Sequence, residues 1–144
     1  MSEHSGYAPP VPPADRLTEP FWEATAEARY LLQWCKVCEQ PVYYPRYACP
    51  VCLGDLLEWR TASGRGTVHA FSIVHTPIAP WMADRMPYVA ALVDLEEGVR
   101  VLTNIVDCDP RQVAVGAAVE VRWQPLDDGR ALPWFRLACC AGAR

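Results

Sequence analysis

The sequence has no strongly basic segment and no long apolar run. Its 144 residues carry 13 Lys and Arg against 17 Asp and Glu, a formal net charge of −4. Because side chains that neutralise phosphates supply most non-specific affinity for nucleic acids, this balance argues against a nucleic-acid partner. The longest uncharged apolar run, Tyr88–Val93, is far too short to cross a bilayer. We therefore expect neither nucleic-acid binding nor membrane association.

The beginning of the sequence also lacks the features of a secretion signal. The letters SEHSGYAPPVPP contain neither a cationic region nor an apolar core. Three scattered cysteines, Cys108, Cys139 and Cys140, agree with a reducing compartment. We expect a cytoplasmic protein.

Familiar catalytic motifs are missing as well. The sequence has no glycine-rich phosphate loop, no G-x-S-x-G and no H-E-x-x-H. His69 and His75 are six residues apart on an alternating segment, which predicts that they share one face, and a structural or surface role fits them better than catalysis. Cys139 and Cys140 have no base nearby in the sequence. We expect a chain that is not an enzyme on its own.

Four of the seven cysteines form two C-x-x-C pairs separated by ten residues, Cys35, Cys38, Cys49 and Cys52. Two such turns facing each other give tetrahedral sulfur coordination, as in a closed structural zinc site. The segment Cys49–Cys52 also resembles a rubredoxin knuckle, so iron is the less favoured metal. Two disulfides, or four unrelated core thiols, are the remaining alternatives. With four thiolates bound, no position would stay open for activating a water molecule.

The rest of the chain is divided by its prolines and by its pattern of apolar residues. We expect a mainly β protein with an N-terminal helix, a rubredoxin-like zinc ribbon and a five-stranded OB-fold barrel. The expected segments are a disordered proline-rich lead (1–16), the helix and its lead-in (17–34), the ribbon (35–58), the OB-fold (59–138) and a tail (139–144).

The N-terminal helix is predicted to begin at Thr18, which can cap it, with Pro20 in the first turn. Phe21 and Trp22 place two adjacent aromatic side chains on this short helix. They could pack on the protein's own core or anchor a contact with another protein, and the sequence does not separate the two interpretations.

The barrel is predicted from five segments of period-two alternation. The first of them alternates Val68, Ala70, Ser72 and Val74 against His69, Phe71, Ile73 and His75, and a helical turn at Pro110 separates the third segment from the fourth. This order matches a small Greek-key OB barrel, and a five-stranded sandwich is the competing fold. The five segments are 67–75, 88–95, 99–106, 118–123 and 132–137, preceded by a short strand at 57–60.

One connection is unusually long. Thr76–Pro87 joins two strands with twelve residues, including Trp81, Met82 and Met86, whereas hairpin loops usually have two to five. The loop could recognise a partner or an acyl-CoA, with Arg85 near a phosphate, or it could fold back and plug the barrel.

These motifs, in this order, resemble a known family. They are the Phe-Trp helix, the two cysteine pairs, Pro87-Tyr88-Val89, Leu102-Thr103-Asn104, Asp107-Cys108-Asp109-Pro110 and Leu132-Pro133-x-Phe135-Arg136. The chain is similar, over about residues 17–138, to the zinc-ribbon plus OB-fold proteins grouped as domain of unknown function thirty-five and described as acyl-CoA-associated.

The resemblance implies a role beside an enzyme. Members are accessory subunits of thiolase-fold enzymes, thiolases or retro-aldolases, and others pair with acyl-CoA hydratases. It implies Zn²⁺ on the four cysteines, a hetero-oligomer, and a CoA ester bound jointly with the partner. A single-stranded nucleic-acid-binding module and a rubredoxin-like electron carrier are the alternatives from other classes.

Overall fold

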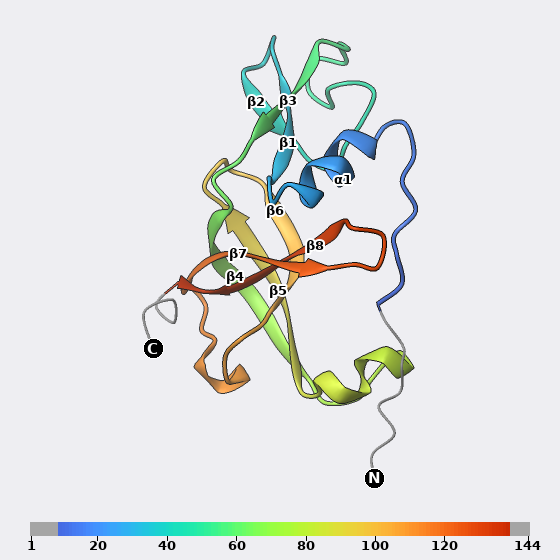
Figure 1. Cartoon of the computed structure of the whole chain (residues 1–144). Coiled ribbons are helices and arrows are strands. Elements are labelled where there is room, and N and C mark those ends of the chain that lie inside the picture. Colours follow the sequence, from blue (N-terminus) through green and yellow to red (C-terminus); the bar gives the residue numbers. More distant parts are fainter. Residues whose placement is uncertain (1–8, 139–144) are drawn as a thin grey trace.

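A computed structural model describes residues 9–138, and it divides into a short helix, a three-stranded ribbon and a closed barrel (Figure 1). The elements are α1 (Glu19–Ala26), β1 (Leu31–Cys35), β2 (Gln40–Val42), β3 (Leu57–Thr61), β4 (Arg65–Val74), η1 (Pro80–Arg85), β5 (Tyr88–Leu95), β6 (Arg100–Ile105), η2 (Pro110–Gln112), β7 (Ala118–Pro125) and β8 (Ala131–Leu137). Within residues 9–138, none of the helices has the length and apolarity that a membrane crossing requires.

Helix α1 is capped differently from the prediction. Thr18 is the N-cap residue, but its side chain makes no capping hydrogen bond. The carboxylate of Asp15 instead accepts hydrogen bonds from the backbone N–H groups of Leu17 and Thr18, at 3.0 and 2.8 Å. Thr18 is therefore not the capping side chain, because its hydroxyl donates to Asp15. Pro20 does lie in the first turn.

The ribbon is an antiparallel sheet in the order β2-β1-β3. β1 pairs along its whole length with β3, from Leu31 with Thr61 to Cys35 with Leu57. The expected boundary between ribbon and barrel, after residue 58, thus falls inside a strand that pairs only with the ribbon sheet in the part of the chain described here.

The other five strands form a closed barrel in the order β4-β5-β6-β8-β7. Closure requires β6 to meet β8 in parallel, at Ile105 and Phe135, and η2 lies between the third and fourth barrel strands, as the sequence predicts. A closed barrel of this order confirms the OB-fold over the open sandwich. Its centre is filled by Phe135 and by fully buried valines on four strands: Val68, Val89, Val93, Val101 and Val119.

A β-bulge in β4 changes which side chains face the core. Val68 pairs with Val93 and Ala70 with Leu92, so His69 is the extra residue. Beyond the bulge the alternation reverses, and Phe71 and Ile73 pack against the core. The predicted alternation is therefore wrong after residue 68. His75 lies beyond the end of β4, so the expectation that it shares a face with His69 is wrong too.

Ribbon and barrel share one apolar core. Tyr30 and Leu32 from the ribbon side belong to the same buried cluster as the barrel residues. The ring of Tyr30 lies 6.4 Å from that of Phe135, and its backbone carbonyl accepts a 2.7 Å hydrogen bond from the N–H of Ala62. The connection between β3 and β4 is only three residues long, so the two parts are joined with little freedom.

Helix α1 closes the same junction from the side. Thr25 is buried, and its hydroxyl donates to the carbonyl of Trp22 and accepts from the N–H of Ala131, at 2.6 and 3.1 Å. Arg130 lies over the ring of Trp22 and donates to the carbonyl of Pro12 at 2.7 Å. These contacts fasten the helix and part of the N-terminal lead to the β7–β8 hairpin.

Candidate functional site

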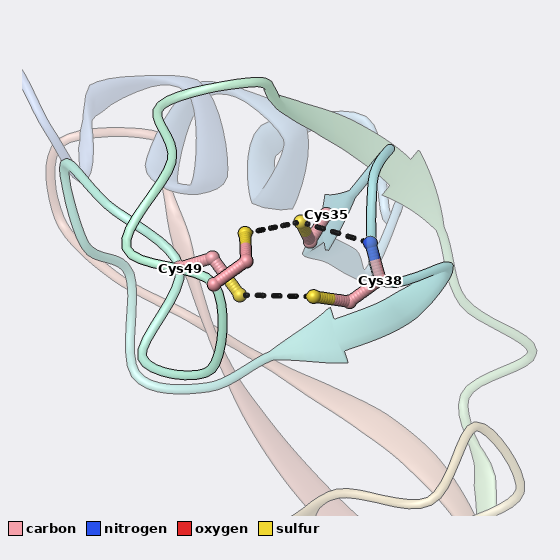
Figure 2. Close-up of side chains that lie close together, drawn as sticks. Cys35, Cys38 and Cys49 are labelled. Atoms are coloured by element: carbon pink, nitrogen blue, oxygen red, sulfur yellow. Dashed lines mark hydrogen bonds between the residues drawn. The ribbon is translucent and has the colours of Figure 1, made fainter.

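The four cysteines of the ribbon converge on one point (Figure 2). Cys35 is the last residue of β1 and Cys38 follows it on the turn toward β2, while Cys49 and Cys52 lie on the turn before β3. All four sulfur atoms lie within 4.8 Å of one another, and the Cys35–Cys52 and Cys38–Cys49 sulfur pairs are 3.7 and 3.9 Å apart. Figure 2 shows the side chains pointing inward from two facing turns.

The two turns have similar hydrogen-bonding schemes. The Cys35 sulfur accepts from the N–H of Cys38 and the Cys49 sulfur accepts from the N–H of Val51, both at 3.4 Å. The carbonyls of Cys35 and Cys49 accept from Glu39 and Leu53, both at 2.9 Å. Each turn therefore holds its cysteines by backbone bonds, as a preformed ligand site needs.

These distances fit a tetrahedral metal site. Four sulfurs at about 2.3 Å from one ion would lie about 3.8 Å from each other, and the observed sulfur pairs are at 3.7 and 3.9 Å. Disulfide bonds need about 2.05 Å, and the four cysteines are free thiols, so the disulfide alternative is wrong. The four cysteines form a metal site, and no histidine or carboxylate belongs to this group.

The pKa values of two of the four thiols are shifted in opposite directions within the site. Backbone N–H groups of Cys52 and Val51 lower the pKa of Cys49 to about 7. The pKa of Cys38 is raised to about 12, chiefly by desolvation and then by hydrogen bonds to the other three thiols. A bound dication would offset the repulsion among four thiolates, and a filled shell would leave no position for substrate.

A second feature is a cavity of about 190 Å³ beneath η1. The long loop predicted from the sequence supplies Trp81, Met82 and Arg85 to its lining, and Met82 is buried. The guanidinium of Arg85 lies 4.9 Å from the centre of the Trp134 ring, which the sequence did not single out. The loop thus folds back over the barrel and also encloses a hollow. The remaining lining residues are Pro87, Tyr88, Asn104, Ile105, Val106, Asp107 and Cys108.

The predicted aromatic contacts lie elsewhere. Phe21 is half-buried against the shared core, with its ring 5.8 Å from Tyr30, and Trp22 is held beneath Arg130. Both line an apolar groove of about 290 Å³ between α1, the ribbon and β6, which also includes Tyr43 and Tyr44. α1 lies beside the ribbon and η1 lies at the far end of the barrel, so the structure does not bring the two predicted contact sets together (Figure 1).

The histidine of the bulge belongs to an exposed ion-pair group. Arg100 donates to both carboxylate oxygens of Asp94, at 2.7 and 3.1 Å, and its Nη2 lies 3.1 Å from Nδ1 of His69. All three side chains are substantially exposed. This arrangement is a surface network on the barrel wall and does not resemble a nucleophile with its base.

Comparisons with known proteins agree with this architecture. Family models described as the rubredoxin-like zinc ribbon domain of ChsH2 and its C-terminal OB-fold domain match residues 22–58 and 59–124. A solved chain from an Ltp2–ChsH2 (DUF35) aldolase is 34% identical, with a TM-score of 0.80, and the match covers 89% of this chain and 99% of that one.

Curated relatives carry two kinds of name. A DUF35 domain-containing scaffold protein of Methanocaldococcus jannaschii is 38% identical over 124 residues, 80% of this chain and 85% of the relative. A probable enoyl-CoA hydratase alpha subunit of Thermomonospora curvata is 37% identical over 129 residues, 88% of this chain. The chain spans only 39% of that hydratase subunit, and 65% of a second scaffold protein, from Methanothermobacter thermautotrophicus.

A four-cysteine ribbon joined to an OB barrel is therefore the class of protein that the fold and the site define. The chain belongs to the DUF35 family, in the group represented by ChsH2.

Proposed function

We propose that the chain is a non-catalytic accessory subunit of a thiolase-fold enzyme, a thiolase or retro-aldolase, in acyl-CoA metabolism. The observation that carries the proposal is the similarity along 99% of the DUF35 chain of an aldolase assembly, at 34% identity. Relatives named as scaffold proteins support a role without chemistry of its own. In this role the partner supplies the catalytic residues, and this chain stabilises it and helps to shape its acyl-CoA site.

The cavity beneath η1 is the part of this chain that we assign to the acyl-CoA. Its lining is mostly apolar, which suits an acyl group or another apolar part of the thioester. Arg85, a cation in this lining, would contact a CoA phosphate placed at the rim. Met86 follows η1 directly and turns the chain into β5. Trp81, Met82, Arg85 and Met86 are thus one candidate contact set, and Phe21 and Trp22 of α1 are the other, for the partner.

Zn²⁺ is the metal that we propose for the ribbon. Four thiolates in two closed turns are typical of structural zinc, and the matching family model is described as a zinc ribbon. Metal analysis of the purified chain should give one zinc per chain. One iron per chain, with a reversible redox couple, would support the rubredoxin-like alternative instead.

Two relatives favour a second candidate partner. They are named as a probable enoyl-CoA hydratase alpha subunit and as a 3-oxo-4,17-pregnadiene-20-carboxyl-CoA hydratase alpha subunit. A hydratase subunit is therefore the alternative enzyme for this chain to join.

We also propose that nucleic acid is not a partner of this chain. Five exposed or half-exposed arginines of the ribbon and barrel each form an ion pair with a carboxylate. The pairs are Arg60–Glu58, Arg65–Glu96, Arg100–Asp94, Arg122–Asp107 and Arg136–Glu120. Paired cations have little charge left for phosphates, so we expect no salt-sensitive binding of single-stranded DNA at micromolar concentrations.

Co-expression tests the proposal. The chain is expressed with candidate thiolase-fold and hydratase subunits from the same genome, and tagged purification followed by an acyl-CoA assay identifies which subunit it joins. We expect a stable complex with a thiolase-fold subunit, whose solubility and activity fall without this chain. A thiolase-fold subunit that is soluble and fully active alone would contradict the proposal, and a complex with only the hydratase would select the alternative.

A further inference from the structure

Four exposed aliphatic side chains surround the metal site at the end of the ribbon. Val37 and Val51 each precede the second cysteine of a pair, and their exposed fractions are 61% and 66%. Leu53 is 78% exposed and Leu56 is 57% exposed. The carbonyl of Leu56 accepts from the N–H of Lys36 at 3.0 Å, which places it beside the first turn. We call these four residues the ribbon tip.

Leu53 adopts a backbone conformation that a leucine rarely takes. Its φ is +61°, a left-handed value that glycine adopts without cost. In the metal-binding turn this conformation accompanies a hydrogen bond from the N–H of Leu53 to the carbonyl of Cys49, and Glu39 has the equivalent bond with a φ of +53° in the first turn. The exposed side chain makes little contact within the chain that could offset the strain. Leucine at this position therefore lowers the stability of the free protein, which indicates a use outside it.

Two carboxylates that form no ion pair in the described part of the chain, and one paired lysine, lie beside the ribbon tip. Glu39 lies two residues after Val37, and Asp55 lies between Leu53 and Leu56. Neither carboxylate forms an ion pair within residues 9–138, whereas Lys36 is 3.4 Å from Glu58. An apolar surface with unpaired carboxylates at its edge suits a protein surface that is apolar in the middle and basic at its rim.

The carboxylates of Glu39 and Asp55 also make two other binding partners of the ribbon tip unfavourable. A second copy of the chain in a two-fold dimer would bring the same carboxylates against the first pair, and like charges across an interface are unfavourable. An anionic membrane surface would repel them as well. A basic-rimmed protein partner remains.

We propose that the ribbon tip is the surface on which the enzyme subunit docks, by inserting Leu53 and its neighbours into an apolar hollow edged by Lys or Arg. This inference rests on the proposed function, and it assigns the main contact to the metal-bound ribbon instead of to α1 or η1.

The first test uses opposite effects on stability and on binding. Leu53→Gly removes the side chain and relieves the backbone, so the thermal midpoint of the free chain should stay the same or rise, with the metal retained. Its affinity for the enzyme subunit that co-purifies with the wild-type chain should fall at least tenfold, as expected for losing one buried leucine from an interface. Leu53→Asp should weaken binding further.

Val115→Asp is the matched control, because Val115 is 67% exposed and lies in the connection between η2 and β7, away from the ribbon. It should bind like the wild type. A second test replaces both carboxylates, as Glu39→Lys with Asp55→Lys. This variant should bind less tightly at low salt, and the difference should shrink in 0.5 M NaCl.

The outcomes separate the two hypotheses. If the wild-type chain binds no enzyme subunit, the proposed function fails and this inference falls with it. If the wild type binds and Leu53→Gly and Leu53→Asp bind equally well, only the ribbon tip is overturned. Binding that drops for both Leu53 variants but not for Val115→Asp supports it. If the variant with Glu39→Lys and Asp55→Lys binds more tightly than the wild type, the proposal that the partner surface has a basic rim is overturned.

Discussion

The ribbon and the barrel are held together by different means. Apart from Leu32, which packs into the barrel's core, the ribbon's own buried cluster consists of Cys35, Val42 and Cys49, two of which are metal ligands. The barrel has a continuous apolar centre around Phe135, to which four strands contribute fully buried valines. The ribbon therefore depends on its ion for folding, and the barrel depends on apolar burial.

This difference sets how each part responds to change. In the ribbon, the loss of one metal ligand should destabilise all three strands, whereas the side chains around the ligands point outward and contribute little to stability. In the barrel, many residues share the stability, so single changes have limited effects. We therefore expect substitutions of the exposed side chains on the ribbon to change stability little, apart from Leu53, whose positive φ already lowers it.

The largest expected effect comes from removing the metal. Cys49→Ser should abolish metal binding and unfold β1–β3, because structural zinc sites supply about 10–16 kcal/mol in apparent terms. Hydrogen exchange should show loss of protection in β1–β3 with protection retained in the barrel. Cys108→Ser, a thiol outside the metal group, is the control and should keep the metal. Unchanged protection of β1–β3 in the metal-free protein would break the comparison.

Truncating a side chain in the barrel core should have the reverse effect, destabilising the barrel while the ribbon keeps its metal. Phe135 is fully buried where β8 meets β6, and Phe135→Ala should destabilise the barrel by about 3–5 kcal/mol through lost burial and a cavity. Denaturant unfolding followed by tryptophan fluorescence measures this, with zinc content as the second readout. The contradicting result would be that Phe135→Ala loses its metal at denaturant concentrations where its barrel is still folded. The ribbon would then depend on Phe135 more than the barrel does.

The junction between the two parts gives a smaller effect. Thr25→Ala leaves the buried N–H of Ala131 without its acceptor, which should cost about 1–3 kcal/mol. Thr25→Ser keeps the hydroxyl and is the control. Hydrogen exchange at α1 and at the β7–β8 hairpin should increase together in the alanine variant. An increase at α1 alone would mean that the helix is not fastened through this bond.

Two tyrosines at the junction give the smallest expected effect, because it appears only at alkaline pH. Burial raises the pKa of Tyr43 to about 12, with further contributions from Tyr44, and burial raises the pKa of Tyr30 further still. A raised pKa in the folded state means that stability is complete below pH 10 and falls as pH rises from 10 through 12. Tyr30→Phe should reduce this alkaline loss in a pH series of thermal midpoints. An identical pH dependence in the variant would assign the loss to other groups.

Much of the fold could be predicted because its signals are local. The cysteine spacing depends on backbone turns of fixed length, so it predicts that the four sulfur atoms converge, as they do. The limits of β5 at Tyr88–Leu95 and the helical turn at Pro110 follow from alternation and from proline.

The misses arise from contacts that the sequence does not show. The bulge at His69 depends on register with β5, and one extra residue reverses every side chain after it. Asp15 displaced Thr18 as the capping side chain because the turn before α1 brings its carboxylate to the exposed N–H groups. Trp134 reached the cavity beneath η1 only through the closure of the barrel, so nothing local to its position could have indicated it.

The chain order of the two parts has a consequence for how the protein forms during synthesis. The ribbon sheet joins residues within 31–61, whereas closing the barrel pairs β4 near Thr67 with β7 near Ala118. Contacts between distant residues form slowly, and N-terminal units leave the ribosome first. We therefore expect the ribbon to capture its ion while the last barrel strands are still being made. Metal supply would then limit the yield of correctly assembled protein at an earlier step than barrel folding does.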